Sequence, residues 1–109
     1  MVITIDTLRA DHVTAEIAPT LSRLASEAIV FDQAITVTPL TLPSPASLLT
    51  ARLPPAHGVR DNSIYSLAAG TPTYTSLLRD RGYARAAFVS PAVLDSRYGL
   101  DAGFDTYDD

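Results

Sequence analysis

The sequence predicts an α/β fold in which helices pack against a largely parallel sheet, and three observations support this. Short β-rich runs alternate with segments whose apolar residues recur at helical spacing, an order typical of layered α/β folds. Proline-rich turns separate several of these segments. Hydrophobic residues make up 47% of the chain and charged residues 18%, a mixture that indicates a buried core rather than disorder. With 109 residues, positions 1–109 are expected to form at most one modest domain.

The first part of the chain predicts a strand, a helix and a second, bent strand. Residues 2–5 are a β-branched run that ends at Asp6, as expected for a buried parallel strand that places a polar residue at its carboxyl end. Helical spacing over residues 19–28, with a proline in the first turn, predicts a helix. Two β-rich patches, 29–31 and 34–37, follow and indicate one bent strand.

The second part predicts two more helices and a last strand. A helix is expected to begin at Pro43 and continue to residue 51, which would place Thr41 just before its amino terminus. Residues 54–62 are a turn-rich polar loop. Thr73 caps the next helix, and residues 84–89 read as another buried strand. The resulting order is β-α-β-α-loop-α-β, with the order of strands in the sheet left open.

Charge and composition exclude several classes of function. A net charge of −4 gives no basic surface for nucleic acid, and the acids gathered at the end of the sequence read as a solvated face. The chain has no cysteine, which excludes disulfides, thiolate metal sites and cysteine nucleophiles. No apolar run approaches the roughly 18 residues of a membrane span, and the first residues do not resemble a secretory signal. The cellular compartment is left open.

Asp6 and Thr41 stand at positions where ligands bind in such folds. A carboxylate suits calcium, magnesium, manganese or zinc, and a hydroxyl beside such an ion loses its proton more readily. Backbone N–H groups near Ser44, at the helix amino terminus, would favour a phosphate or sulfate anion. Spacing alone is weak support, because a threonine before a proline-started helix is more often only a cap or turn residue.

Six sequence blocks, in one order, resemble those of the sulfatase family in the alkaline-phosphatase superfamily. They are VITIDTLRADH at 2–12, APTLSRLA at 18–25, PLTLPSPASLLT at 39–50, HGVRDN at 57–62, RGY at 81–83 and GLDAGFD at 99–105. The resemblance spans essentially the whole chain. It implies that residues 1–109 are the amino-terminal part of a catalytic domain with an alkaline-phosphatase-like three-layer fold, present here in part.

The resemblance also implies roles for four residues and a divalent metal ion as cofactor. Asp6 would be a metal ligand, and Thr41 would be both a metal ligand and the nucleophile. Asn62, about twenty positions beyond Thr41, would donate to the developing oxyanion and contact substrate. Ser44 would bind substrate. Threonine is not known as a precursor of formylglycine, so Thr41 would act as a plain alkoxide, as in threonine-dependent phosphodiesterases and phosphoglycerol transferases.

The implied activity is hydrolysis of a small-molecule or glycan ester of sulfuric or phosphoric acid. One alternative is a phosphoglycerol or phosphoethanolamine transferase of the same superfamily. The other is a non-catalytic pseudoenzyme fragment, because Pro45 stands where related sequences have arginine or histidine. The second metal-binding block of the family, similar to D-H-G-E, is not among these residues, so the isolated chain is expected to be inactive and to need the remainder of the catalytic domain as its partner.

The remaining candidate residues have structural interpretations. His57 is expected to fix its loop by hydrogen bonds, with substrate contact by His57 or Arg60 as the less favoured alternative. Asp11, beside His12, is expected to fix the loop after the first strand. Five aromatic residues are expected to serve packing: Tyr83, Phe88, Tyr98, Phe104 and Tyr107.

Overall fold

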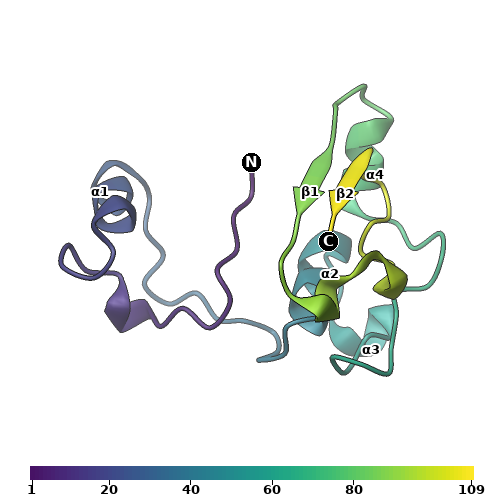
Figure 1. Cartoon of the computed structure of the whole chain (residues 1–109), viewed down its shortest axis with the longest axis horizontal. Helices are drawn as coiled ribbons and strands as arrows, with labels where there is room; N and C mark the ends of the chain where they lie inside the picture. Colours follow the sequence, from purple (N-terminus) through teal and green to yellow (C-terminus); the bar gives the residue numbers. More distant parts are fainter. The chain divides into compact units, whose positions relative to one another are not determined.

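The computed structural model describes residues 1–109, which form two compact units, Met1–Ile35 and Thr36–Asp109 (Figure 1). The four α-helices are α1 (Pro19–Glu27), α2 (Pro43–Thr50), α3 (Pro54–His57) and α4 (Tyr74–Arg79). The two strands are β1 (Ala86–Phe88) and β2 (Thr106–Asp108). Three single-turn 3₁₀ helices cover Ala10–His12, Ala92–Leu94 and Ser96–Tyr98. Helices therefore accompany a small parallel sheet, and the predicted α/β class is confirmed.

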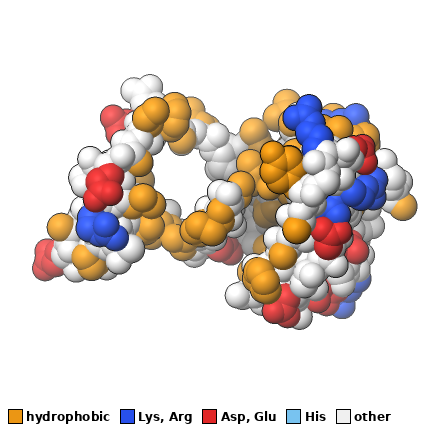
Figure 2. Space-filling view, turned by 90° about the horizontal axis from the view of Figure 1, so that it is seen from above, with side chains coloured by type: hydrophobic (Ala, Val, Ile, Leu, Met, Phe, Trp, Pro, Cys, Tyr) orange, Lys and Arg blue, Asp and Glu red, His pale blue; other side chains and the backbone are white.

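The first unit contains one α-helix and no strand. The helix predicted over 19–28 is confirmed as α1, with Pro19 in its first turn. The predicted strands at 2–5 and 29–37 are wrong: both segments are irregular, and Val2 is 60% exposed. Extended backbone needs a partner strand for its N–H and C=O groups, and this unit provides none. Apolar side chains of both segments are exposed, among them Ile3, Phe31 and Ile35, and Figure 2 shows apolar side chains in orange on the surface.

The second unit contains the sheet and the core. Strands β1 and β2 lie side by side and are parallel, with Ala87 opposite Tyr107 (Figure 1). The core consists of apolar side chains from α2 and from the segments around it: Leu42, Ala46, Leu49, Val59, Leu67 and Leu100. Because α2 provides two of these residues and Leu42 precedes it directly, the helix that follows Thr41 is fixed by core packing.

Signals in the neighbouring sequence explain α4, whereas an ion pair between residues far apart in the sequence explains β2. Thr73 caps α4 as predicted, in a reciprocal hydrogen-bonded capping box with Ser76. Strand β1 lies within the predicted 84–89 segment but is not buried, since Phe88 is 74% exposed. Strand β2 was not predicted, because the acidic residues of this segment were expected only to face solvent.

The Arg85–Asp105 pair closes the start of this sheet. The Arg85 side chain is 8% exposed, and its Nε donates to Asp105 Oδ2 at 3.1 Å while its Nη2 donates to Oδ1. The Arg85 backbone N–H donates to the same carboxylate at 2.9 Å, and the Arg85 carbonyl accepts from the N–H of Asp105. Hydrogen bonds from Arg85 lower the pKa of Asp105. The pair therefore fixes the register of β2 on β1.

The aromatic predictions divide between the core and the surface. Tyr98, Phe104 and Tyr107 pack against the core, and the rings of Phe104 and Tyr107 lie 5.8 Å apart, so these three predictions are confirmed. The Tyr107 hydroxyl donates to the Leu94 carbonyl at 2.6 Å, and burial raises its pKa to about 12. Tyr83 and Phe88 are exposed and do not pack against the core, so their predicted packing is wrong.

Gly103 is expected to be intolerant of a side chain, whereas Gly82 is not. Both have positive φ, +91° and +77°, but a Cβ at Gly103 would lie 2.6 Å from the Ser76 nitrogen and a Cβ at Gly82 would meet nothing. Gly82→Ala should cost about 1–2 kcal/mol from its backbone alone. Gly103→Ala should cost roughly 1–3 kcal/mol more because of the clash. Urea unfolding of both variants measures the difference, and equal midpoints would contradict it.

Candidate functional site

Asn62 reaches the amino terminus of α2 at Leu42, the residue that follows Thr41. Thr41 is partly buried and directly precedes Leu42, the N-cap residue of α2, which confirms its predicted place before the helix. The backbone N–H of Leu42 donates to Asn62 Oδ1 at 2.9 Å. Since a backbone N–H can only donate, this bond identifies the Asn62 oxygen as the acceptor and its NH₂ group as the donor half of the amide.

The Leu42–Asn62 hydrogen bond maintains a backbone conformation that the local sequence disfavours. Leu42 has φ −81° and ψ −47°, within the helical region. A residue that precedes a proline is normally pushed out of that region by the proline ring, and Pro43 follows directly. Complete burial of the Leu42 side chain and the bond to Asn62 oppose this preference. Asn62 therefore helps to set the direction of the chain at Thr41.

The backbone N–H groups near Ser44 are already used, so the prediction that they bind an anion is wrong. The N–H of Ser44 donates to the Leu40 carbonyl at 3.1 Å, and that of Ala46 donates to the Leu42 carbonyl at 3.2 Å. Pro43 and Pro45 have no N–H to donate. Helical geometry thus begins early enough to engage the donors of the first turn. The role of the Ser44 side chain as a substrate contact stays a prediction.

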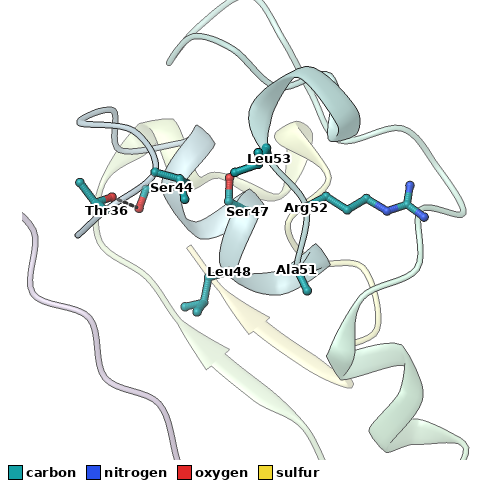
Figure 3. A pocket seen from close by; sticks show the side chains of 8 residues that line it. Thr36, Ser44, Ser47, Leu48, Ala51, Arg52 and Leu53 are labelled. Atoms are coloured by element: carbon teal, nitrogen blue, oxygen red, sulfur yellow. Dashed lines mark hydrogen bonds between the residues drawn. The ribbon is translucent and has the colours of Figure 1, made fainter. Parts of the chain in front are cut away.

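A cavity of about 360 Å³ lies beside α2 but excludes Thr41 and Asn62 from its lining. The residues that line it are apolar apart from three with hydroxyl groups and one arginine: Thr36, Val37, Ser44, Ser47, Leu48, Ala51, Arg52 and Leu53. In Figure 3 the Arg52 side chain extends away from the other labelled residues. The Ser44 hydroxyl faces that of Thr36 at 3.5 Å, a marginal hydrogen-bond distance. Ser44 is thus the one predicted site residue that reaches this cavity.

His57 is buried and fixes the loop after α3, which confirms its structural interpretation. Only 6% of His57 is exposed. Its Nδ1 accepts from the Val59 N–H at 3.1 Å, so the proton of the neutral ring lies on Nε2, which is 2.9 Å from the Ser47 hydroxyl. Burial lowers the pKa of His57 and so favours this neutral form. With Nε2 as a donor, His57 does not act as a base toward Ser47.

Asp6 lies in the first unit, at a turn after the irregular residues 2–5. It is exposed, and the next residue, Thr7, has φ 55°, a left-handed conformation that is uncommon for threonine. The Thr7 hydroxyl donates to the Asp6 carbonyl at 2.8 Å. Asp6 and Thr41 belong to different units, and a cation shared by the two stays a prediction.

Asp11 fixes the segment that follows Asp6, as predicted. Its carboxylate accepts two hydrogen bonds from Arg9, at 2.9 and 2.6 Å, and lies 3.1 Å from His12 Nδ1. The bonds from Arg9 lower the pKa of Asp11 more than any other contact does. Nowhere in residues 1–109 do three acidic or histidine side chains gather closely enough to hold a metal ion.

Comparison with known families agrees with part of the sequence-based resemblance. A family model described as type I phosphodiesterase / nucleotide pyrophosphatase matches residues 1–95, a range that includes Asp6, Thr41, Ser44 and Asn62. That family is a member of the alkaline-phosphatase-like superfamily, so the superfamily resemblance is confirmed; the sulfatase family itself is not shown. No curated protein and no solved structure matches the chain. None of its helices is long and apolar enough to cross a membrane.

Proposed function

Because the chain belongs to the type I phosphodiesterase / nucleotide pyrophosphatase family, we propose that it provides the nucleophile part of a metal-dependent phosphodiesterase site, with Thr41 as the nucleophile. Family membership by itself supports a phosphoester hydrolase. The observation that supports the finer assignment is the hydrogen bond from Leu42 to Asn62. This bond brings Asn62 to the residue that follows Thr41, and it supports the proposal that the Asn62 NH₂ group and the Thr41 hydroxyl contact the same phosphoryl group.

The proposed reaction is an in-line displacement at phosphorus. The Thr41 Oγ1 attacks, the bond from phosphorus to the leaving-group oxygen breaks, and water then releases the phosphoryl group from Thr41. The Asn62 NH₂ group donates to a non-bridging oxygen as negative charge develops on it. In the first turn of α2, two residues are prolines, and the N–H groups of the other two already donate to backbone carbonyls. Neutralising the negative charge of the phosphoryl oxygens therefore depends on side chains and on a cation.

A divalent metal ion fits the donor chemistry of Asp6 and Thr41. Carboxylate and hydroxyl oxygens suit calcium, magnesium, manganese or zinc, and these two residues would hold the ion together with ligands from elsewhere in the catalytic domain. When bound, such an ion lowers the pKa of a coordinated hydroxyl and offsets charge on the phosphoryl oxygens. A plain threonine nucleophile favours phosphate over sulfate esters, since sulfatases use formylglycine at this position.

The native protein that contains this sequence should cleave bis(p-nitrophenyl) phosphate and should lose that activity when EDTA removes divalent cations. The assay compares this substrate with p-nitrophenyl sulfate, after restoring calcium, magnesium, manganese or zinc one at a time. We expect cation-dependent phosphodiester turnover and slower sulfate turnover. Cleavage of the sulfate alone would replace the proposal by a sulfatase, and turnover of neither ester with any cation would favour a pseudoenzyme.

A further inference from the structure

Two hydrogen-bonded connections, here called ties, join α2 to the segment 57–62. Both reach the turn that follows Thr41. The first is the hydrogen bond from the Leu42 N–H to Asn62. The second runs from His57 to Ser47, whose hydroxyl in turn donates to the Pro43 carbonyl at 2.8 Å. Leu42 and Pro43 are consecutive, so the two ties hold adjacent residues of the chain.

The second tie is a directional relay of hydrogen bonds. The Val59 N–H donates to His57 Nδ1 at 3.1 Å, His57 Nε2–H donates to the Ser47 hydroxyl at 2.9 Å, and that hydroxyl donates to Pro43. Each side chain in the relay uses one donor and one acceptor, so only one arrangement of protons satisfies all three bonds. The relay is buried, and breaking one bond would leave a buried polar group unsatisfied.

We infer that His57, acting through Ser47, is a positioning residue that sets the place of Asn62 relative to Thr41. His57 and Asn62 are the two ends of one short segment: Asn62 bonds to Leu42 directly before α2, and His57 bonds to Ser47 within the helix. If the His57 end is released, the buried Val59 still anchors the segment, but Gly58, with its left-handed φ of +85°, is no longer fixed from the His57 side, and Asn62 keeps only its hydrogen bond to Leu42. The effect of this connection on phosphodiester cleavage rests on the proposed function, whereas the hydrogen bonds between His57, Ser47 and Pro43 do not.

Two matched substitutions in α2 test this inference in the native protein. Ser47→Ala removes the hydroxyl that joins His57 to Pro43. Thr50→Ala removes an equivalent hydroxyl, which donates to the Ala46 carbonyl at 2.7 Å in the same helix. Both variants lose one hydroxyl-to-carbonyl bond four residues back along α2, but only the first disconnects His57. His57→Gln is a third variant, because its amide can still donate to Ser47.

The structural readout is hydrogen exchange of the Leu42 amide, measured by NMR. Ser47→Ala should speed this exchange by roughly tenfold, the effect of losing about one hydrogen bond, while Thr50→Ala should leave it unchanged. His57→Gln should give a smaller effect than Ser47→Ala. In the unsubstituted protein the ring nitrogens of His57 should report a neutral imidazole protonated on Nε2. Equal exchange in the two alanine variants, or a proton on Nδ1, would overturn the inference.

The kinetic readout separates this inference from the proposed function. Ser47→Ala should lower kcat for the phosphodiester by roughly 10- to 100-fold with KM within about twofold, because the oxyanion donor is misplaced rather than lost. Thr50→Ala should retain kcat. If the unsubstituted protein has no activity but only Ser47→Ala speeds Leu42 exchange, the positioning stands and the proposed function fails. If the protein is active and Ser47→Ala retains its full kcat, the positioning fails.

Discussion

Replacing Thr41 by alanine should lower kcat for phosphodiester cleavage by about 10⁴-fold or more in the native protein. The alanine variant has no oxygen to attack phosphorus, so the covalent route is closed and only cleavage by water remains. The variant also lacks a proposed ligand of the cation, so a higher cation concentration should be needed for saturation, whereas the contact of substrate with Asn62 should remain. Steady-state kinetics with bis(p-nitrophenyl) phosphate, at saturating divalent cation, measures the change.

Two control variants make the Thr41 result specific. Thr41→Ser retains a hydroxyl at the same position and should keep far more activity than Thr41→Ala. Thr50→Ala removes a hydroxyl that lies farther along α2 and bonds only to its own helix, so its kcat should stay near that of the unsubstituted protein. Thr41→Ala with more than about a tenth of the original kcat would mean that another group attacks phosphorus.

Replacing Leu100 by alanine should have the largest effect on folding of the second unit. Leu100 is 2% exposed and belongs to the core together with Leu42 and Leu67. Removing its side chain loses buried apolar surface and leaves a cavity, at a cost of about 2–5 kcal/mol. In a domain of this size, each kcal/mol lowers Tm by roughly 4–8 °C. Thermal unfolding followed by circular dichroism measures the shift.

The matched control for this prediction is Leu77→Ala in α4. Leu77 is 63% exposed, so its truncation removes little buried surface. Both variants delete the same atoms, and only their burial differs. Similar values of Tm for the two would show that Leu100 is not part of a core in the folded protein.

Three of the four α-helices could be predicted from the sequence because their signals are local, whereas the short α3 lies in a segment that was predicted to be a loop. Pro19 and Pro43 stand in the first turns of α1 and α2, and Thr73 caps α4 through a bond to a residue three positions away. Strands depend on partners instead. Residues 2–5 have high β propensity and form no strand, whereas β2 forms at acidic residues because Asp105 pairs with Arg85, twenty positions earlier.

The candidate site could be predicted only in part for the same reason. The position of Thr41 before α2 follows from Pro43, and the approach of Asn62 to that point was implied by resemblance rather than by any local pattern. The interaction of His57 with Ser47 joins residues ten positions apart through a turn, and neither residue type predicts it. The sequence around His57, with prolines before it and a glycine after it, predicted only that this histidine would fix its own loop.

The prolines at positions 43 and 45 have a consequence for when the nucleophile is presented during folding. Each disfavours helical backbone at the residue before it, so the first turn of α2 does not form autonomously as a peptide. In the folded protein, the burial of Leu42 and its hydrogen bond to Asn62 support this turn. We therefore expect Thr41 to reach its final position before α2 only as the second unit folds. A nascent or denatured chain would then lack a working nucleophile.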